Sequence, residues 1–260
     1  MIGLRDRESG RIELHPAELF LLWHALGLGE LPAILGVPHL GYRERERAEM
    51  VVAASAALTE RGLGTVNQPT SDLEGALRTV ADAELLLDLH AEDADRSLRA
   101  VGASGNREAV VLGVSGETAW LTGVRPTGLV AGLVDVLEPA SAPLGRTANV
   151  RVSDYEAACR AGERGGSTEF AARLRDAGLR PPEVNTLARA VSQRTGGGQF
   201  GGGVRTGRDT LRRTGAVLTW LDTVDGRYVL RSGPEWITCT PAGPGVLRTM
   251  ATELVDTLRG

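Results

Sequence analysis

The sequence predicts an α+β fold in which helices flank strands that pair largely in antiparallel fashion. Segments with apolar residues at helical spacing alternate with blocks of short apolar strands, and turn residues separate the strands within each block. The order of helices, strand meander and closing helix occurs twice along the 260 residues. We therefore expect a pseudo-two-fold duplicated unit with halves at about residues 14–138 and 147–259.

Three helices are predicted in the first third of the chain. Pro16 suits a first helical position, and Ser71–Glu74 has the pattern of a capping box. Glycines follow the first two segments, as is common where a chain leaves a helix. The predicted helices are Pro16–Leu26, Glu44–Arg61 and a third that begins at Ser71 and includes Leu77 and Val80.

Four strands and one helix complete the first half. Turns rich in Gly, Asn, Asp and Ser separate the strands, which is typical of an antiparallel meander. Pro126 then opens a helix that continues through Leu137 and ends before Pro139. The predicted strands are Leu85–His90, Ser97–Ala103, Glu108–Val114 and Thr118–Val124.

The second half repeats this order, after a segment rich in proline and glycine. Its strongest hairpin signal is Asp225-Gly226. A short local match supports the duplication, because Trp120-Leu121-Thr122 and Trp236-Ile237-Thr238 both precede a closing helix. The predicted helices are Ser153–Arg160, Thr168–Ala177, Pro182–Arg194 and Pro244–Leu258, and the predicted strands are Gln199–Arg205, Leu211–Thr223, Arg227–Ser232 and Glu235–Thr240.

Composition excludes several classes of function. The chain contains no lysine, so Schiff-base chemistry and a phosphate-binding loop with its lysine are impossible. A formal net charge of -4 without a basic cluster argues against binding nucleic acid. Neither a signal peptide nor a membrane-spanning apolar run is evident, which favours a cytoplasmic protein without stable membrane insertion. Cys159 and Cys239 form no metal or disulfide pattern.

A glycine-rich segment, Gly196–Gly203, formally contains Gly-x-Gly-x-x-Gly at Gly196, Gly198 and Gly201. A dinucleotide site needs a strand before these glycines and a helix after them, whereas here a helix precedes and a strand follows. We therefore favour a structural role, in which the glycines let another backbone or a partner approach a strand closely. An enzyme that binds a nucleotide or small ligand through this segment is the alternative.

Other catalytic patterns are incomplete. Ser104 and Ser115 each fall one residue short of Gly-x-Ser-x-Gly and lie in predicted hairpin turns. The acidic cluster Glu92, Asp93 and Asp95 is more simply a solvated turn than a cation site. The four histidines lack metal-ligand spacing; they are His15, His24, His39 and His90. The sequence thus predicts no catalytic residue, cofactor or metal.

Three tryptophans, Trp120, Trp220 and Trp236, lie in predicted strands. We expect at least two of them in the core, which leaves one as a candidate exposed anchor for a partner. Along 216–223, Val217, Thr219 and Leu221 would share one face of the strand, and Leu218 and Trp220 the other. Such a strand is either covered on both sides or offers one side to a partner.

Three segments together carry a family resemblance. They are Gly198-Gln199-Phe200-Gly201, the predicted hairpin Trp220–Val229, and Glu18–Leu35 with its Leu-Gly-Leu-Gly-x-Leu-Pro-x-x-Leu pattern. With these segments the chain resembles the EspG family, the cytosolic chaperones of actinobacterial type VII secretion. The resemblance extends from about Leu14 to Leu258. It implies a single domain over residues 1–260, with a central, largely antiparallel sheet flanked by helical subdomains.

The resemblance also implies a non-enzymatic function. EspG-like chaperones bind the apolar helical tip of PPE-type proteins in PE–PPE heterodimers and keep these substrates soluble for secretion. The family has no sharp binding motif, so only regions carry over to this sequence. We expect partner contacts from the sheet around Gln199, Phe200, Leu218 and Trp220, with core packing as the alternative for Phe200 and Trp220. An adjustable rim is expected from the hairpin residues Ser104, Gly105, Asn106 and Arg107.

Overall fold

The computed structural model describes residues 10–41, 43–206, 210–213, 215 and 217–259. The chain divides into two compact units, and each is described here by itself. The N-terminal unit comprises Met1–His90, Arg96–Leu133 and Gly202–Arg212, and the C-terminal unit comprises Ala91–Asp95, Val134–Gly201 and Arg213–Gly260.

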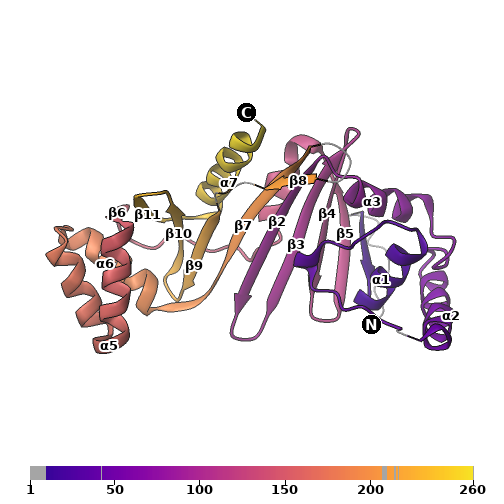
Figure 1. Ribbon diagram of the computed structural model, residues 1–260, viewed down its shortest axis with the longest axis horizontal. Helices are drawn as coiled ribbons and strands as arrows, with labels where there is room; N and C mark the ends of the chain where they lie inside the picture. Colours follow the sequence, from indigo (N-terminus) through magenta and orange to yellow (C-terminus); the bar gives the residue numbers. More distant parts are fainter. Residues whose placement is uncertain (1–9, 42, 207–209, 214, 216, 260) are drawn as a thin grey trace. The chain divides into compact units, whose positions relative to one another are not determined.

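The N-terminal unit is built on an antiparallel meander (Figure 1). Its strands are β1 (Arg11–Leu14), β2 (Leu85–Asp93), β3 (Ser97–Gly105), β4 (Glu108–Ser115) and β5 (Thr118–Val124). In the sheet these strands follow the order β1-β5-β4-β3-β2. The last residues of β7 (Arg194–Thr206) come next to β2, and β8 (Thr210–Arg213) pairs with β7. Strand β1 therefore lies at the edge and pairs with the end of the meander, with Leu14 opposite Ala119.

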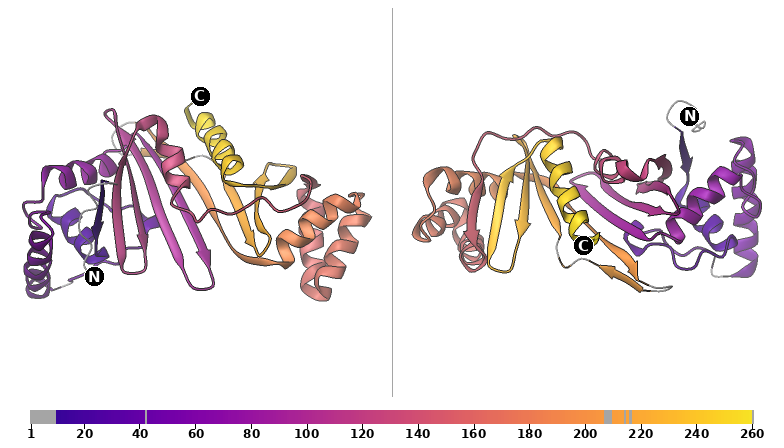
Figure 2. Two further views of the ribbon diagram at one scale, coloured as in Figure 1. Left: turned by 180° about the vertical axis from the view of Figure 1, so that it is seen from behind. Right: turned by 90° about the horizontal axis from the view of Figure 1, so that it is seen from above.

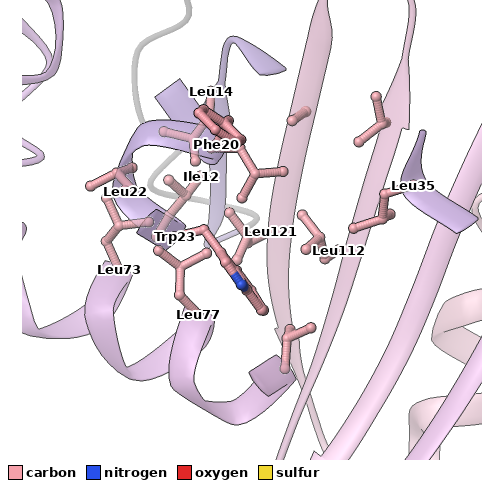
Figure 3. Packing of buried hydrophobic residues seen from close by; sticks show 14 of the residues in the cluster. Ile12, Leu14, Phe20, Leu22, Trp23, Leu35, Leu73, Leu77, Leu112 and Leu121 are labelled. Carbon is pink, nitrogen blue, oxygen red and sulfur yellow. The ribbon is translucent and has the colours of Figure 1, made fainter. Parts of the chain in front are cut away.

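Helices cover one face of this sheet with an apolar core. They are α1 (Pro16–Ala25), η1 (Ala33–Leu35), α2 (Glu44–Glu60) and α3 (Ser71–Ala81). Figure 3 shows Trp23, Leu73 and Leu77 from the helices packed toward Leu112 and Leu121 of the strands. The opposite face holds η2 (Pro126–Gly128) and α4 (Leu129–Val134), and Leu129 and Leu133 lie directly over Gly102.

The first helix begins with a capping box. The side chain of His15 accepts a hydrogen bond from the amide of Ala17 at 3.1 Å, and the amide of His15 donates to Glu18 Oε2 at 2.7 Å. These bonds satisfy donors that a helix start otherwise leaves unpaired. Pro16 at the first position favours the same start.

The C-terminal unit has the same kind of meander, with the strand order β7-β9-β10-β11-β6. Its strands are β6 (Ala148–Arg151), the first part of β7, β9 (Leu218–Thr223), β10 (Gly226–Ser232) and β11 (Trp236–Pro241). Its helices are α5 (Val152–Asp176), α6 (Pro181–Ser192) and α7 (Pro244–Arg259). Helix α5 breaks at Gly166, whose φ of 72° a residue with a side chain rarely adopts.

Helices pack on both faces of this second sheet. Helices α5 and α6 bury Tyr228, Leu230 and Cys239 from one side. Helix α7 packs against β9 from the other side, and Figure 2 shows it running along the sheet while α5 and α6 gather beside β6. In the described part of the chain, no helix is both long and apolar enough to cross a lipid bilayer.

Most predicted elements are confirmed, with shifted ends. The helices that begin at Pro16, Glu44 and Ser71 and the four strands of the first meander all form. The segments Ser153–Arg160 and Thr168–Ala177 are helical, but they join as α5 across Gly166. The helix that begins at Pro126 starts as a 3-10 turn and ends at Val134 rather than Leu137.

Two predicted strands, Leu211–Thr223 and Gln199–Arg205, and the end of the helix predicted over Pro182–Arg194 need correction. Leu211–Thr223 is two strands, β8 and β9, and its residues Thr214 and Ala216 lie outside the described residues. Strand β7 starts at Arg194, five residues before the predicted start at Gln199, and helix α6 ends at Ser192. The short edge strands β1 and β6 were not expected from the sequence.

Candidate partner-binding surface

The glycine-rich segment lies within strand β7, not in a loop. Helix α6 precedes it and further residues of β7 follow it directly, whereas a dinucleotide site requires a helix that begins just after its glycines. A Cβ on Gly196 would lie 2.7 Å from the carbonyl oxygen of Glu92, and one on Gly202 would lie 2.8 Å from Leu87 Cδ2. The glycines therefore allow neighbouring strands to approach closely, as the structural interpretation predicts.

Three of the residues expected at a partner contact are buried. Phe200 is 1% exposed, Leu218 2% and Trp220 0%. The cross-strand pairs Phe200–Leu218 and Gly198–Trp220 place their side chains on the face of the sheet that α7 covers. These three side chains are therefore packed in the core of the unit, which for Phe200 and Trp220 is the alternative to partner contact that the sequence left open, and a partner contact of the sheet around them stays a prediction. Because α6 packs on the other face of β9, this strand is covered on both sides.

Gln199 differs from its neighbours because it is exposed. It pairs with Thr219 of β9, one position away from the buried pair Phe200–Leu218. Its side chain therefore lies on the opposite face from Phe200, since successive residues of a strand point to opposite faces. Gln199 is the residue of this predicted group that solvent and a partner can reach.

The hairpin between β3 and β4 is a tight turn with an unusual composition. Gly105 pairs with Glu108, which leaves Asn106 and Arg107 as the two loop residues. Their φ angles are 50° and 69°, positive at both positions as a type I′ turn requires. Asn tolerates this conformation, but Arg at the second position replaces the glycine that such turns favour. Both side chains are exposed, and Ser104 and Gly105 are half-buried.

A groove of about 700 Å³ lies beside this hairpin within the N-terminal unit. Arg107 and Glu108 line it from the hairpin, and Asp72 lines it from the first turn of α3. Glu108 Oε2 accepts a hydrogen bond from Thr79 Oγ1 at 3.1 Å. Arg125 also lines the groove, so the lining contains two arginines and two carboxylates. These charges balance, and the groove therefore has no excess positive charge to select an anion such as a nucleotide.

The two cysteines are not set up as nucleophiles. Burial raises the pKa of the Cys239 thiol to about 12, and burial also raises the pKa of Cys159. Near Cys159, burial is the largest cause of a raised pKa at Tyr155 as well. Reactive cysteines need a lowered pKa, because the thiolate is the nucleophile. Both thiols are therefore protonated at neutral pH.

The predicted groups fall in different units. The hairpin Ser104–Arg107 belongs to the N-terminal unit, whereas Gln199, Phe200, Leu218 and Trp220 belong to the C-terminal unit. Of the three strand tryptophans, Trp120 and Trp220 are buried, and Trp236 is 46% exposed. One exposed tryptophan is what the sequence led us to expect.

Arg151 was not among the predicted site residues, because it lies in strand β6, which was not expected. Its guanidinium is 5.0 Å from the ring centre of Trp236. The alternation of apolar and polar residues in Ala148-Asn149-Val150-Arg151 was a local signal for this strand, in which the apolar residues are buried and the polar residues exposed.

Comparison with known proteins assigns the chain to a family. The model of the EspG family matches residues 15–253, so the chain belongs to the EspG family. Its fold is similar to that of the type VII secretion system chaperone EspG5 of Mycobacterium tuberculosis, solved in complex with a PE25–PPE41 dimer. The TM-score is 0.78 at 16% sequence identity, covering 95% of this chain and 96% of that chain. A sequence search of curated proteins found no significant match.

Proposed function

We propose that this chain is a cytosolic chaperone of type VII secretion whose client is a PE–PPE-type dimer. It binds the apolar helical tip of the PPE-type subunit, keeps the dimer soluble and supports its secretion. A chaperone of this kind needs a surface that covers apolar residues of the client and releases them later, so moderate affinity suits it.

The observation that carries this proposal is membership of the EspG family over residues 15–253. Agreement in fold over 95% of the chain with EspG5, whose structure contains a PE25–PPE41 dimer, supports the same assignment. Two features of the chain agree with binding rather than catalysis. Its glycine-rich segment is a paired strand, and burial keeps both of its thiols protonated.

We propose Gln199 and the hairpin Ser104–Arg107 as contacts for the client. Gln199 is exposed at a strand centre, and the side chains of Asn106 and Arg107 are exposed at a hairpin tip. The positive φ of Arg107 supports a functional reason for arginine at this position, because glycine fits the turn with less strain. Phe200, Leu218 and Trp220 are buried in the C-terminal unit, where they hold strands β7 and β9 together behind Gln199.

We also propose that the single EspG-like domain arose by duplication of halves at about 14–138 and 147–259. In each half a short strand pairs antiparallel with the last strand of the same meander, as β1 does with β5 and β6 with β11. Helices separate the short strand from the meander, and a further helix follows it. An arginine of the short strand also stacks on a tryptophan of the last strand, as Arg11 does on Trp120 and Arg151 on Trp236.

Co-expression tests the proposed function directly. The chain carrying an affinity tag is produced with each PE–PPE-type pair encoded by the same organism, and the eluate is analysed by size exclusion with light scattering. We expect a soluble, stoichiometric complex with at least one pair, and less soluble client when the chain is omitted. If the folded chain elutes alone with every pair, the proposed function is wrong.

A further inference from the structure

One face of the C-terminal sheet is only partly covered by helices. Opposite residues of neighbouring strands share a face. The pairs Leu218–Arg231, Arg231–Thr238 and Thr238–Asn149 therefore trace one face from β9 across β10 and β11 to β6. Residues two apart along a strand also share a face, which adds Trp236 and Arg151.

Helix α7 covers only the first part of this face. It packs against β9, and Glu253 of α7 lies 3.6 Å from the guanidinium of Arg231 on β10. Beyond Arg231, the face is open. Trp236 is 46% exposed, Asn149 and Arg151 are exposed, and Thr238 is half-buried. Figure 2 shows α7 along this sheet and α5 and α6 beside β6.

The other face of the same strands is closed. Leu230, Cys239 and Ala148 occupy successive strands there, and each is buried against α5 and α6. The open face is therefore not required for the core of the unit. We call the open surface formed by Asn149, Arg151, Arg231, Trp236 and Thr238 the Trp236 face.

The Trp236 face carries an aromatic ring and a cation in contact. The guanidinium of Arg151 lies 5.0 Å from the ring centre of Trp236, within the range of a cation–π interaction. Arg231 has a carboxylate partner in Glu253. Among the described residues, no carboxylate lies within ion-pair distance of Arg151, so its positive charge is available to a partner.

Comparison with the N-terminal unit shows that this exposure is not imposed by the fold. There Arg11 stacks on Trp120 at 4.7 Å from the ring centre, in the corresponding pair of strands. Trp120 lies against Gly113, where any Cβ would overlap the ring, and is only 8% exposed. The tryptophan of such a contact is therefore buried in one unit and exposed in the other, although Arg11 is itself 40% exposed and lies opposite Thr122 rather than Trp120.

We propose that the Trp236 face is a docking surface for a helical segment of the client that presents an apolar side chain flanked by carboxylates. The apolar side chain covers the Trp236 ring, and a carboxylate pairs with Arg151. Tryptophan and arginine are the residue types most enriched among interface hot spots. This inference rests on the proposed function and specifies the chemistry of one contact.

Binding measurements with four variants test the Trp236 face. The purified chain and the purified PE–PPE-type dimer that co-elutes with it are titrated by calorimetry. We expect Trp236→Ala to weaken binding by roughly 30-fold or more, as loss of a hot spot does. Arg151→Glu should weaken it roughly 10-fold or more, because it replaces an attractive charge by a repulsive one. The controls Val224→Ala and Arg45→Glu change exposed residues elsewhere and should bind within about twofold of the unchanged chain.

The outcomes separate this inference from the proposed function. If the unchanged chain and both Trp236-face variants bind the dimer equally well, the docking inference is overturned and the proposed function stands. If the unchanged chain binds no PE–PPE-type dimer, the proposed function fails and the inference fails with it. Arg151 is exposed, so Arg151→Glu should fold and keeps the test valid even if Trp236→Ala does not fold. Thermal unfolding of each variant shows whether it is folded.

Discussion

Glu18 and Arg61 form a buried ion pair in the N-terminal unit. The two side chains are only 8% and 11% exposed. Arg61 also donates to the carbonyl oxygen of Glu13 at 2.7 Å, and Glu18 accepts from the amide of His15. One pair of side chains therefore ties together the edge strand β1 and the helices α1 and α2.

Removing one partner of this pair should be costly. We expect Glu18→Ala to lower the free energy of unfolding by about 3–5 kcal/mol, because it leaves the Arg61 charge buried without its counterion. Glu49→Ala is the control, since its pair with Arg45 is exposed and should contribute less than about 0.5 kcal/mol. Urea denaturation measures both variants, and equal losses would refute the special role of the buried pair.

Two glycines should respond in opposite ways to the same substitution. Gly202→Ala places a Cβ 2.8 Å from Leu87 Cδ2 and 2.9 Å from the Leu86 carbonyl oxygen, so we expect a loss of roughly 1–3 kcal/mol. Gly75→Ala lies in helix α3 with no atom within 4 Å of the added Cβ, and we expect a gain of roughly 0.5–1 kcal/mol. Denaturant midpoints of the two variants would contradict this if they moved in the same direction.

Alkaline pH should destabilise the C-terminal unit through Cys239. Burial raises the folded-state pKa of this thiol to about 12, above the value of about 8.5 for an exposed cysteine. The stability contributed by the neutral thiol is therefore complete below about pH 8.5 and is lost as the pH rises toward 12.

Thermal unfolding between pH 8 and 11 measures this loss, and the unfolding temperature should fall as the pH rises. Cys239→Ala should have a lower unfolding temperature at pH 8 but a shallower decline. An identical decline in the variant and the unchanged chain would show that Cys239 is not responsible.

At the scale of elements, the sequence predicted most helices because their signals are local. Proline at the first helical position of α1 and the capping-box pattern at Ser71 mark helix starts that the structure contains. The meander strands were also recognisable, because turn residues bound each apolar run. The break at Gly166 is local too, yet the sequence did not reveal that the helical segments on its two sides form one element.

The pairing of the short edge strands was not predictable for a physical reason. Strands β1 and β6 have four residues each, and the register with β5 and β11 aligns them. Such pairing joins segments more than 80 residues apart, so no local pattern specifies it. The same limit affected the candidate site, because the burial of Phe200 and Trp220 depends on α7, which comes later in the chain.

The β3–β4 hairpin allows a test at the scale of one turn. We expect Arg107→Gly to stabilise the N-terminal unit by roughly 0.5–1 kcal/mol, because glycine adopts the observed φ of 69° with little strain. Arg107→Ala should bring no such gain, since alanine has the same steric conflict as arginine. Chemical denaturation distinguishes the two, and equal stabilities would argue against strain at this position.

At the scale of the whole molecule, the proposed function depends on family membership and on surfaces rather than on a catalytic site. The EspG family match covers residues 15–253, and the fold agrees with EspG5 across nearly the entire chain. The exposed residues that we propose for recognition are polar or aromatic, namely Gln199, the hairpin tip and the Trp236 face. Phe200 of the glycine-rich strand and Trp220 of its neighbour β9 are buried within the C-terminal unit.

Co-purification with a PE–PPE-type dimer from the same organism is the most direct test of the proposed chaperone function. We expect the tagged chain to retain the dimer as a soluble complex of fixed stoichiometry through size exclusion. We also expect the yield of soluble dimer to fall when the chain is left out. A folded chain that elutes alone with every such pair, with client solubility unchanged by its presence, would contradict the account.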